Sequence, residues 1–379
     1  MQYRTFGPLD WKVSALGFGA MRLPMREDKP DEIDEPLAIK MIRHSIDNGV
    51  NYIDTAYPYH GGKSEPLVSR VLKDGYREKV KVATKSPSWM LTQPDDFDRY
   101  LDEQLERLQI DYVDFYLLHS LNRHRWPPLR EMKITKQAEK ALQDGRIKYF
   151  GFSFHDDVET FKSIVDDYDG WTFCQIQYNF MDTHYQAGIE GLRYAAEKGL
   201  GVVIMEPIRG GQLAVTPPAQ VAEIWDQAPV RRSPVDWALQ WIWNQSEVSV
   251  VLSGMSTMKQ VEENLASADR SGVGTLSDDE ISLVEKAAKA YDELSPIRCT
   301  ACRYCMPCPH GVDIPQVFRI YNDVTLYGDT ERPRRLYTLR LTPEECADRC
   351  VACGECLEKC PQGIEIPGWM KKADALLAP

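Results

Sequence analysis

The sequence predicts an α/β protein in which a closed barrel of eight parallel strands, each followed by a helix, precedes a smaller, mainly helical domain. Apolar strand patterns alternate with amphipathic helical patterns through most of the chain, as expected for such a barrel. Polar side chains occur where successive strand patterns end. Nine of the ten cysteines follow residue 298, so the end of the chain has a different chemistry. We expect a barrel domain over residues 1–294 and a second domain over residues 295–379.

The strand and helix patterns can be placed in order along the barrel domain. Residues 3–12 predict a hairpin that closes one end, and residues 13–21 predict the first barrel strand, in which Gly17 and Gly19 permit close backbone approach. Further strand patterns lie near residues 50–55, 80–85, 112–118, 147–153, 173–178, 201–206 and 248–254. Helical patterns lie at about 36–48, 64–75, 94–109, 133–145, 157–168, 187–198, 233–245 and, after a capping box, 278–294.

The net charge of the chain is −12 and its pI is about 5.2. An acidic protein is a poor match for a nucleic acid or an anionic membrane surface. The N-terminal residues lack the apolar stretch of a signal peptide, and no apolar run reaches the roughly 18 residues that a membrane span needs. We therefore expect a cytoplasmic protein whose cysteines are reduced.

Three successive strand patterns end in Asp54, Lys85 and His119, and Tyr59 lies in the loop after the first of them. The C-terminal ends of parallel strands are where barrels build their active sites. A buried carboxylate such as Asp54 requires a cationic or hydrogen-bonded partner, which Lys85 can supply. The sequence therefore predicts that these four side chains form one site.

This set of groups suits the reduction of a carbonyl. Tyr59 is the natural donor of a proton to the developing alkoxide, but a free phenol has a pKa of about 10. A nearby cation favours the phenolate, so Lys85 would lower that pKa while Asp54 balances its charge. His119 can hydrogen-bond the substrate oxygen and orient it.

The same residues resemble those of the aldo-keto reductase family. That family carries Ile-Asp-Thr-Ala-x-x-Tyr, matched here by residues 53–59, a lysine ending the next strand and a histidine ending the one after. Gly-Lys-Ser-Glu at 62–65 resembles the family's Gly-x-Ser-Glu, and the likeness extends from about residue 2 to 294. The resemblance implies hydride transfer between NADP(H), which the family favours over NAD(H), and a small aldehyde or ketone.

The resemblance also implies where the nucleotide lies, since no Gly-x-Gly-x-x-Gly follows a strand. Ser153 and Gln175 would hold the nicotinamide amide, and Met205 stands where the family has a ring-stacking tyrosine, with barrel core as its alternative. Gln260 stands where an arginine is common, leaving Lys259 as the near cation. The expected cofactor contacts are Gly19, Met21, Asp54, Ser153, Gln175, Met205, Gly211, Gly254, Ser256, Gln260 and Asn264.

The late cysteines form two runs, at residues 299–309 and 350–361. The second is the bacterial ferredoxin run Cys-x2-Cys-x2-Cys-x3-Cys-Pro, whose fourth cysteine ligates the other cluster in two-cluster ferredoxins. The sequence predicts two 4Fe-4S clusters, one on Cys299, Cys302, Cys305 and Cys360 and the other on Cys350, Cys353, Cys356 and Cys308. Zinc is the alternative. Cys346 belongs to neither run.

Each run is followed by a related pentapeptide, Gly-Val-Asp-Ile-Pro or Gly-Ile-Glu-Ile-Pro, which indicates an internal repeat. The long segment between the runs favours a helical ferredoxin-like domain. Its clusters would exchange electrons with a protein partner, or serve a structural or sensing role. A further alternative is a nucleotide-binding electron-transfer subunit that reduces no free carbonyl. Trp89 and the basic, aromatic loop 121–130 are candidate substrate contacts, although an exposed surface loop is the alternative for the second.

Overall fold

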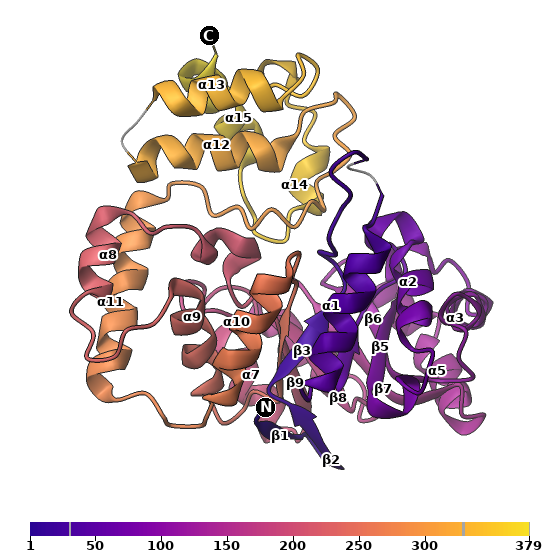
Figure 1. The fold of residues 1–379 in the computed structure, drawn as a ribbon. Helices are drawn as coiled ribbons and strands as arrows, with labels where there is room; N and C mark the ends of the chain where they lie inside the picture. The colour runs from indigo at the N-terminus through magenta and orange to yellow at the C-terminus, as the bar shows by residue number, and fades with distance from the viewer. Residues whose placement is uncertain (30–31, 328–329, 379) are drawn as a thin grey trace. The chain divides into compact units, whose positions relative to one another are not determined.

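The computed structural model describes residues 1–29, 32–327 and 330–378. Eight parallel strands close into a barrel in the order β10, β3, β4, β5, β6, β7, β8, β9, so the predicted barrel is confirmed. Figure 1 shows the labelled strands among the helices that follow them. The barrel strands are β3 (Leu16–Gly19), β4 (Tyr52–Asp54), β5 (Lys81–Ser86), β6 (Val113–Leu121), β7 (Ile147–Phe154), β8 (Phe173–Gln177), β9 (Gly201–Met205) and β10 (Val250–Ser253).

The predicted hairpin consists of β1 (Tyr3–Phe6) and β2 (Leu9–Ser14), which pair antiparallel. Phe6 is fully buried, and its ring centre lies 4.8 Å from that of Phe115 and 5.8 Å from that of Phe173. A side chain at Gly201, the first residue of β9, would collide with the Phe6 ring. The hairpin therefore fills the barrel interior near the N-terminal ends of the strands and leaves the opposite end for chemistry.

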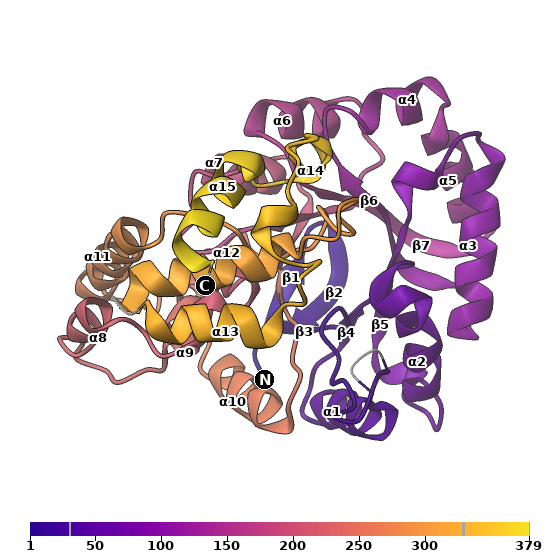
Figure 2. The same cartoon turned by 90° about the horizontal axis from the view of Figure 1, so that it is seen from above.

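Helices surround the strands, as the view from above shows (Figure 2). They are α1 (Glu35–Asp47), α2 (Ser64–Val71), α3 (Asp95–Leu108), α4 (Trp126–Glu131), α5 (Ile134–Gln143), α6 (Val158–Asp166), α7 (Gly188–Glu197), α9 (Pro234–Trp243) and α10 (Met258–Asp269). Side chains of Asp34, Asp157 and Thr257 cap α1, α6 and α10 by accepting a backbone N–H in the first turn. The six-residue α4 was not predicted, because so short a helix carries no readable period.

Short 3-10 turns lie in the connections, and they too carry no period that a sequence can reveal. They are η1 (Tyr59–Gly62), η2 (Arg77–Lys79), η3 (Ser88–Met90), η4 (Arg209–Ala214) and η5 (Ala347–Arg349).

Packing divides the chain into two compact units. The first consists of Met1–Pro207 and Ala238–Leu276, and the second of Ile208–Trp237 and Ser277–Pro379. This division differs from one cut at residue 294, because α11 (Asp278–Leu294) packs against α8 (Ala219–Trp225) within the second unit. The domain boundary at residue 294 stays a prediction.

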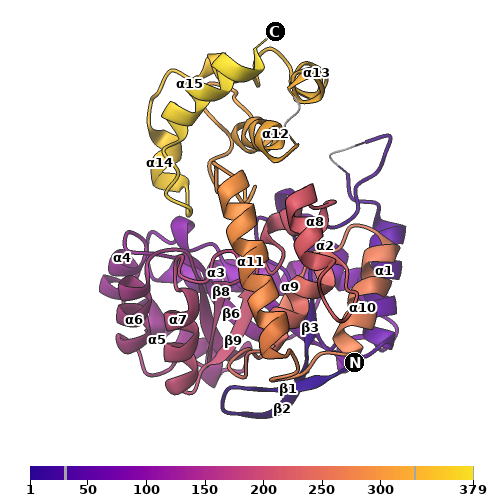
Figure 3. The ribbon, with the colours of Figure 1, turned by 90° about the vertical axis from the view of Figure 1, so that its left-hand side faces the viewer.

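The second unit is mainly helical, as predicted. Its other helices are α12 (Ile314–Tyr327), α13 (Glu331–Arg340), α14 (Glu355–Lys359) and α15 (Ile366–Leu377). The helix α12 packs against α13 and α15 (Figure 3), and Val317, Phe318 and Met370 are buried in their shared core. Across the described part of the chain, no helix has both the length and the hydropathy needed to cross a bilayer.

Candidate functional site

Asp54, Lys85 and His119 lie at or near the C-terminal ends of three neighbouring strands, β4, β5 and β6. Tyr59 is the first residue of η1, in the loop that leaves β4. Because adjacent parallel strands end at the same edge of the barrel, the fold brings all four side chains to one mouth. The predicted grouping is thus present in the first compact unit.

Lys85 is the centre of this group. Its Nζ donates to Asp54 Oδ1 at 2.6 Å and to the Thr55 carbonyl at 2.7 Å, and it lies 4.9 Å from the centre of the Tyr59 ring. Lys85 and Asp54 are both buried. Burial raises the pKa of Asp54 and lowers the pKa of Lys85, and their mutual attraction opposes both shifts. The Lys85 amino group thus contacts the Asp54 carboxyl group and lies close to the phenol ring of Tyr59.

His119 also lies beside Tyr59, with 6.0 Å between ring centres and the rings nearly perpendicular. Burial, reinforced by the charge of Lys85, holds the pKa of His119 well below its usual range. The imidazole is therefore neutral at neutral pH. Its Nδ1 is buried and has no hydrogen-bond partner among the described residues.

A buried network that the sequence did not indicate supports Lys85. Glu65 Oε1 accepts from Thr84 Oγ1 at 2.6 Å and from Gln104 Nε2 at 2.5 Å, and the same Gln104 nitrogen lies 3.1 Å from the Lys85 carbonyl. Arg107 lies 3.3 Å from Glu65. Glu65 was noticed only as part of a family pattern, and nothing marks Gln104 among the polar residues of an amphipathic helix.

The expected nicotinamide contacts lie on β7, β8 and β9. Ser153 pairs with Gln175 in the sheet, and Met205 pairs with Gln177. Ser153 Oγ accepts from the Ser120 amide at 2.7 Å. Gln175 is buried, and its Oε1 has no partner within the part of the chain that the structure describes. Such an acceptor would be satisfied by a bound amide N–H, which fits a nicotinamide.

The expected adenosine and phosphate contacts surround the start of α10. Asn264 donates to Ser253 Oγ at 3.0 Å, and the Ser256 amide donates to Gln260 Oε1 at 2.8 Å. Lys259 pairs with Glu263 at 3.7 Å on an exposed helix face. Side chains of the protein thus already engage part of this turn.

Three other expected contacts lie on different elements. Gly19 ends β3 opposite Asp54, and Met21 follows it as an exposed side chain. Gly211 lies in η4, within the second compact unit. It therefore belongs to a different unit from the remaining expected contacts.

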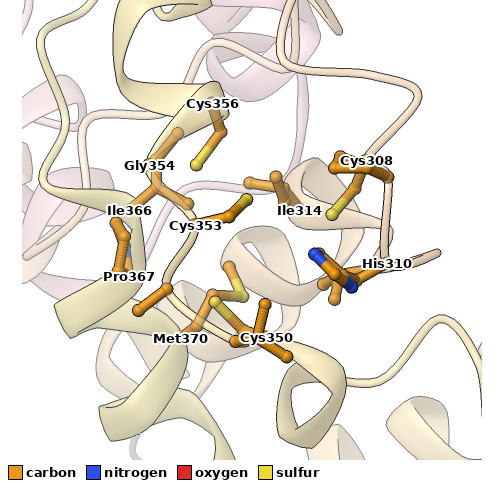
Figure 4. Close-up of a pocket in the computed structure, with 14 residues that line it drawn as sticks. Cys308, His310, Ile314, Cys350, Cys353, Gly354, Cys356, Ile366, Pro367 and Met370 are labelled. Carbon is orange, nitrogen blue, oxygen red and sulfur yellow. The ribbon is translucent and has the colours of Figure 1, made fainter.

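Eight of the nine cysteines of the second unit line two hollows, and Cys346 lines neither. One is lined by Cys308, Cys350, Cys353 and Cys356, whose sulfur atoms face the space between them (Figure 4). The other is lined by Cys299, Cys302, Cys305 and Cys360. Each hollow takes three cysteines from one run and one from the other, as the crossed arrangement predicted from the ferredoxin run requires.

The two hollows share a wall. Ile314 and Ile366, the first residues of α12 and α15, line both of them. These isoleucines occupy equivalent places in the two pentapeptides, and the preceding Asp313 and Glu365 each accept a backbone N–H three residues later. The internal repeat therefore builds two related cavities around one apolar divider.

The cysteine donors fit iron-sulfur clusters better than single metal ions. Among the residues described, no three His, Cys, Asp or Glu side chains converge closely enough to hold one ion. A tetrahedral zinc site needs sulfurs roughly 4 Å apart, because each Zn–S bond is about 2.3 Å long. Burial raises the pKa of Cys305 to about 12 and that of Cys356 to about 11. A bound metal centre would lower these pKa values and hold the thiols as thiolates.

Comparison with known families accounts for the first part of the chain. Residues 15–289 match the model of the aldo/keto reductase family. The chain belongs to this family. A second model, the 4Fe-4S dicluster domain, matches residues 298–365, so this family member carries an iron-sulfur segment after its barrel.

Individual aldo/keto reductase relatives agree with this assignment. An L-galactose dehydrogenase from Arabidopsis thaliana is 29% identical over 294 residues, covering 70% of this chain and 88% of the relative. An NADH-specific methylglyoxal reductase from Escherichia coli is 25% identical, covering 77% of this chain and all of the relative. A solved aldo-keto reductase from Bacillus halodurans superposes with a TM-score of 0.64 at 26% identity, covering 76% of this chain and 97% of that one.

A solved aldo-keto reductase from Klebsiella pneumoniae in complex with NADPH superposes with a TM-score of 0.61 at 24% identity and supports the shared fold. It covers 76% of this chain and 95% of the other. The protein is thus an oxidoreductase of the aldo/keto reductase family with a 4Fe-4S segment.

Proposed function

We propose that the barrel reduces an aldehyde or ketone by hydride transfer, with Tyr59 as the proton donor. One observation carries this proposal: the Tyr59 ring at the barrel mouth lies close to two buried groups, with the Lys85 Nζ 4.9 Å from its centre and the His119 ring centre 6.0 Å away. A bound nicotinamide nucleotide would supply the hydride. The family and the reduced nucleotides named for two relatives support the same reaction class.

Each side chain has a defined task in this proposal. The neutral His119 hydrogen-bonds the carbonyl oxygen and orients it toward the phenol. Tyr59 then gives its proton to that oxygen as negative charge develops there. Lys85 stabilises the phenolate that remains, and Asp54 keeps the ammonium charged and in place.

Ser153 and Gln175 would hold the carboxamide of the nucleotide, with the α10 turn at its other end. One relative is named NADH-specific and another is bound to NADPH, so both nucleotides have to be compared on this protein. Turnover and dissociation constants measured for NADPH and NADH decide between them.

We also propose that the two hollows hold two 4Fe-4S clusters with the crossed ligands given above, in a cytoplasmic protein that passes electrons to a protein partner. Such clusters exchange single electrons. The exposed Cys353 supports an outlet through the cluster of the second run, because the other described ligands are more buried.

Tyr59→Phe tests the barrel proposal. The substitution removes the proton donor but keeps the ring, so we expect kcat for aldehydes to fall roughly 100-fold or more. Nucleotide affinity, measured by fluorescence titration, should stay within about twofold. Unchanged turnover in this variant would remove Tyr59 as the acid.

The exposed Cys353 also suits a second candidate function, an electron-transfer or redox-sensing subunit without carbonyl turnover. Anaerobic addition of NADPH to the full protein, with cluster absorbance and aldehyde reduction followed together, separates the two. Aldehyde reduction supports the carbonyl reductase. Cluster bleaching without any aldehyde turnover supports the second candidate.

A further inference from the structure

The histidine that directly follows the proposed proton donor has an unusual backbone conformation. His60 has φ 52° and ψ 41°, which places it in the left-handed region. Residues with a side chain enter this region at a cost, although histidine does so more readily than most. A strained residue beside a site of chemistry suggests that a specific contact holds it there.

The ring of His60 makes such a contact with the segment that follows β3. Its Nε2 accepts a hydrogen bond from the amide of Leu23 at 3.2 Å. Burial lowers the pKa of His60, and a hydrogen bond with the backbone of Met21 opposes this shift. The ring is therefore neutral at neutral pH, which Nε2 requires in order to accept an N–H.

Residues 20–23, the β3 segment, are fixed to the barrel by hydrogen bonds of their own. The Ala20 amide donates to the carbonyl of Asp54 at 2.8 Å. Further along the segment, the Arg22 carbonyl accepts from Ser256 Oγ at 2.8 Å. The segment that binds the histidine ring is thus anchored to the strand end that bears Asp54.

The backbone of the turn around Tyr59 does little to fix its own position. The turn η1 extends from Tyr59 to Gly62, and each of its four residues is at least partly exposed. Gly61 and Gly62 both have positive φ, and a Cβ at Gly61 would meet nothing within 4 Å. Because glycine can adopt the widest range of backbone conformations, these two residues leave the turn free to shift. The contact of the His60 ring therefore restrains the turn where its backbone does not.

We propose that His60 is a positioning residue for the proton donor. Its ring joins the Tyr59 turn to the β3 segment, which is bonded to the main chain of Asp54, and so fixes the phenol relative to the Asp54–Lys85 pair. Catalysis is sensitive to such placement, because a displacement of about 1 Å can cost roughly 100-fold in rate. This inference rests on the proposed carbonyl reductase activity and adds a residue that supports its acid.

Three substitutions separate the ring contact from the backbone strain. His60→Leu keeps the bulk and removes the acceptor, His60→Gln keeps an acceptor on a side chain of similar reach, and His60→Gly relieves the strain and has no side chain. We expect kcat for an aldehyde to fall roughly tenfold or more in His60→Leu and His60→Gly, and to stay within about threefold in His60→Gln. KM for the aldehyde should change less than about twofold in all three.

A solvent isotope effect distinguishes mispositioning of the acid from a loss of folded protein. Slower transfer of the phenolic proton should raise the ratio of kcat in light water to kcat in heavy water in His60→Leu, whereas a smaller folded fraction lowers both rates equally. His44→Leu is the matched control, because the His44 ring lies 3.4 Å from the side chain of Asn48 at an exposed end of α1. This control should match the unmodified protein in kcat and in the isotope effect. Full kcat in His60→Gly, or equal losses in His60→Leu and His60→Gln, would overturn the proposal.

Amide hydrogen exchange tests the contact without any aldehyde turnover. In the full chain, exchange in peptides spanning residues 20–25 and 56–63 should be about tenfold faster in His60→Leu and His60→Gly, and close to that of the unmodified protein in His60→Gln. Unchanged exchange in every variant would contradict the inference. If the unmodified protein reduces no aldehyde, the reductase proposal fails, and exchange in these peptides still decides whether His60 holds the turn.

Discussion

At the scale of single residues, the contact between Asp54 and Lys85 should affect both the stability of the fold and the proposed reaction. Both side chains are buried and 2.6 Å apart, so each is the counter-ion of the other. Replacing one member of a buried pair leaves an uncompensated charge, which is costly, whereas an exposed pair contributes little. The proposed proton donor thus depends on an ion pair that the fold also requires.

Asp54→Asn should lower both the stability of the fold and the rate of carbonyl turnover. It keeps the shape of the side chain and removes its charge, so we expect a loss of about 3–5 kcal/mol in the free energy of unfolding. Carbonyl turnover should fall at least roughly tenfold, because the pKa of Lys85 drops further. Urea unfolding measures the change in the free energy of unfolding, and steady-state kinetics measure the change in turnover.

Asp47→Asn is the control for that experiment, because Asp47 and Lys79 form an exposed pair at 2.9 Å. Asp47→Asn should change neither the free energy of unfolding nor carbonyl turnover appreciably. Equal stability of Asp54→Asn and Asp47→Asn would contradict the role given to the buried pair.

His155 should make stability depend on pH. Burial lowers its pKa from 6.5 to about 4 in the folded protein. Between these values the unfolded chain binds a proton that the folded protein does not, so stability is full above pH 6.5 and is lost as the pH falls toward 4. At pH 4 the free energy of unfolding should be about 3 kcal/mol lower than above pH 6.5.

His155→Gln should flatten that dependence, because glutamine keeps a hydrogen-bonding group near Gln186 and does not titrate. Melting midpoints of both proteins between pH 5 and 7.5 measure the difference. Parallel pH profiles would show that His155 does not carry this effect.

At the scale of elements, the repeated turns before α12 and α15 impose unequal demands on their glycines. Gly311 has φ +89° and Gly363 has φ +60°, a region that other residues enter at a cost. A Cβ at Gly311 would lie 2.8 Å from the Glu344 carbonyl oxygen, whereas a Cβ at Gly363 would meet nothing within 4 Å. The two turns therefore share a positive φ at the glycine but differ in how closely the main chain packs against it.

Gly311→Ala should consequently be more harmful than Gly363→Ala. Both variants bear the backbone strain of about 1–2 kcal/mol, and only the first adds a collision with the main chain. The measurement is the temperature at which cluster absorbance is lost, together with bound iron per protein. Equal losses in the two variants would contradict this reading of the turns.

At the scale of the whole molecule, the crossed cysteine sets make each proposed cluster a link between two distant segments. Cys360 belongs to the second run but lines the hollow of the first, and Cys308 does the reverse. Each cluster would then close a loop of the chain, so cluster assembly and folding of this segment are coupled.

Cys360→Ala should therefore remove the cluster of the first run. Iron content should fall from about eight atoms per protein to about four, with the remaining signal in electron paramagnetic resonance coming from one cluster. Cys346→Ala, which changes a cysteine that lines neither hollow, should retain about eight. Four iron atoms in the unmodified protein, or zinc by elemental analysis, would refute the two-cluster assignment.

The sequence by itself determined the barrel, the four side chains at its mouth and the two cysteine runs. These features depend on local signals: strand and helix periods, polar residues at strand ends and short cysteine spacings. Each of these signals can be recognised in the sequence without knowledge of the fold. The neighbouring positions of Asp54, Lys85 and His119 then followed from the parallel order of strands.

Only the tertiary structure decided contacts between residues far apart in the chain. No sequence pattern marks the contact of Gln104 with the Lys85 carbonyl or that of Arg125 with the Trp89 ring. In each case the two partners meet only when the barrel closes. The segment Ile208–Trp237 leaves β9 but packs with the second unit, where Gln212 donates to the carbonyl of Cys299. Such contacts depend on how whole elements pack, and sequence periodicity records only which face of each element is apolar.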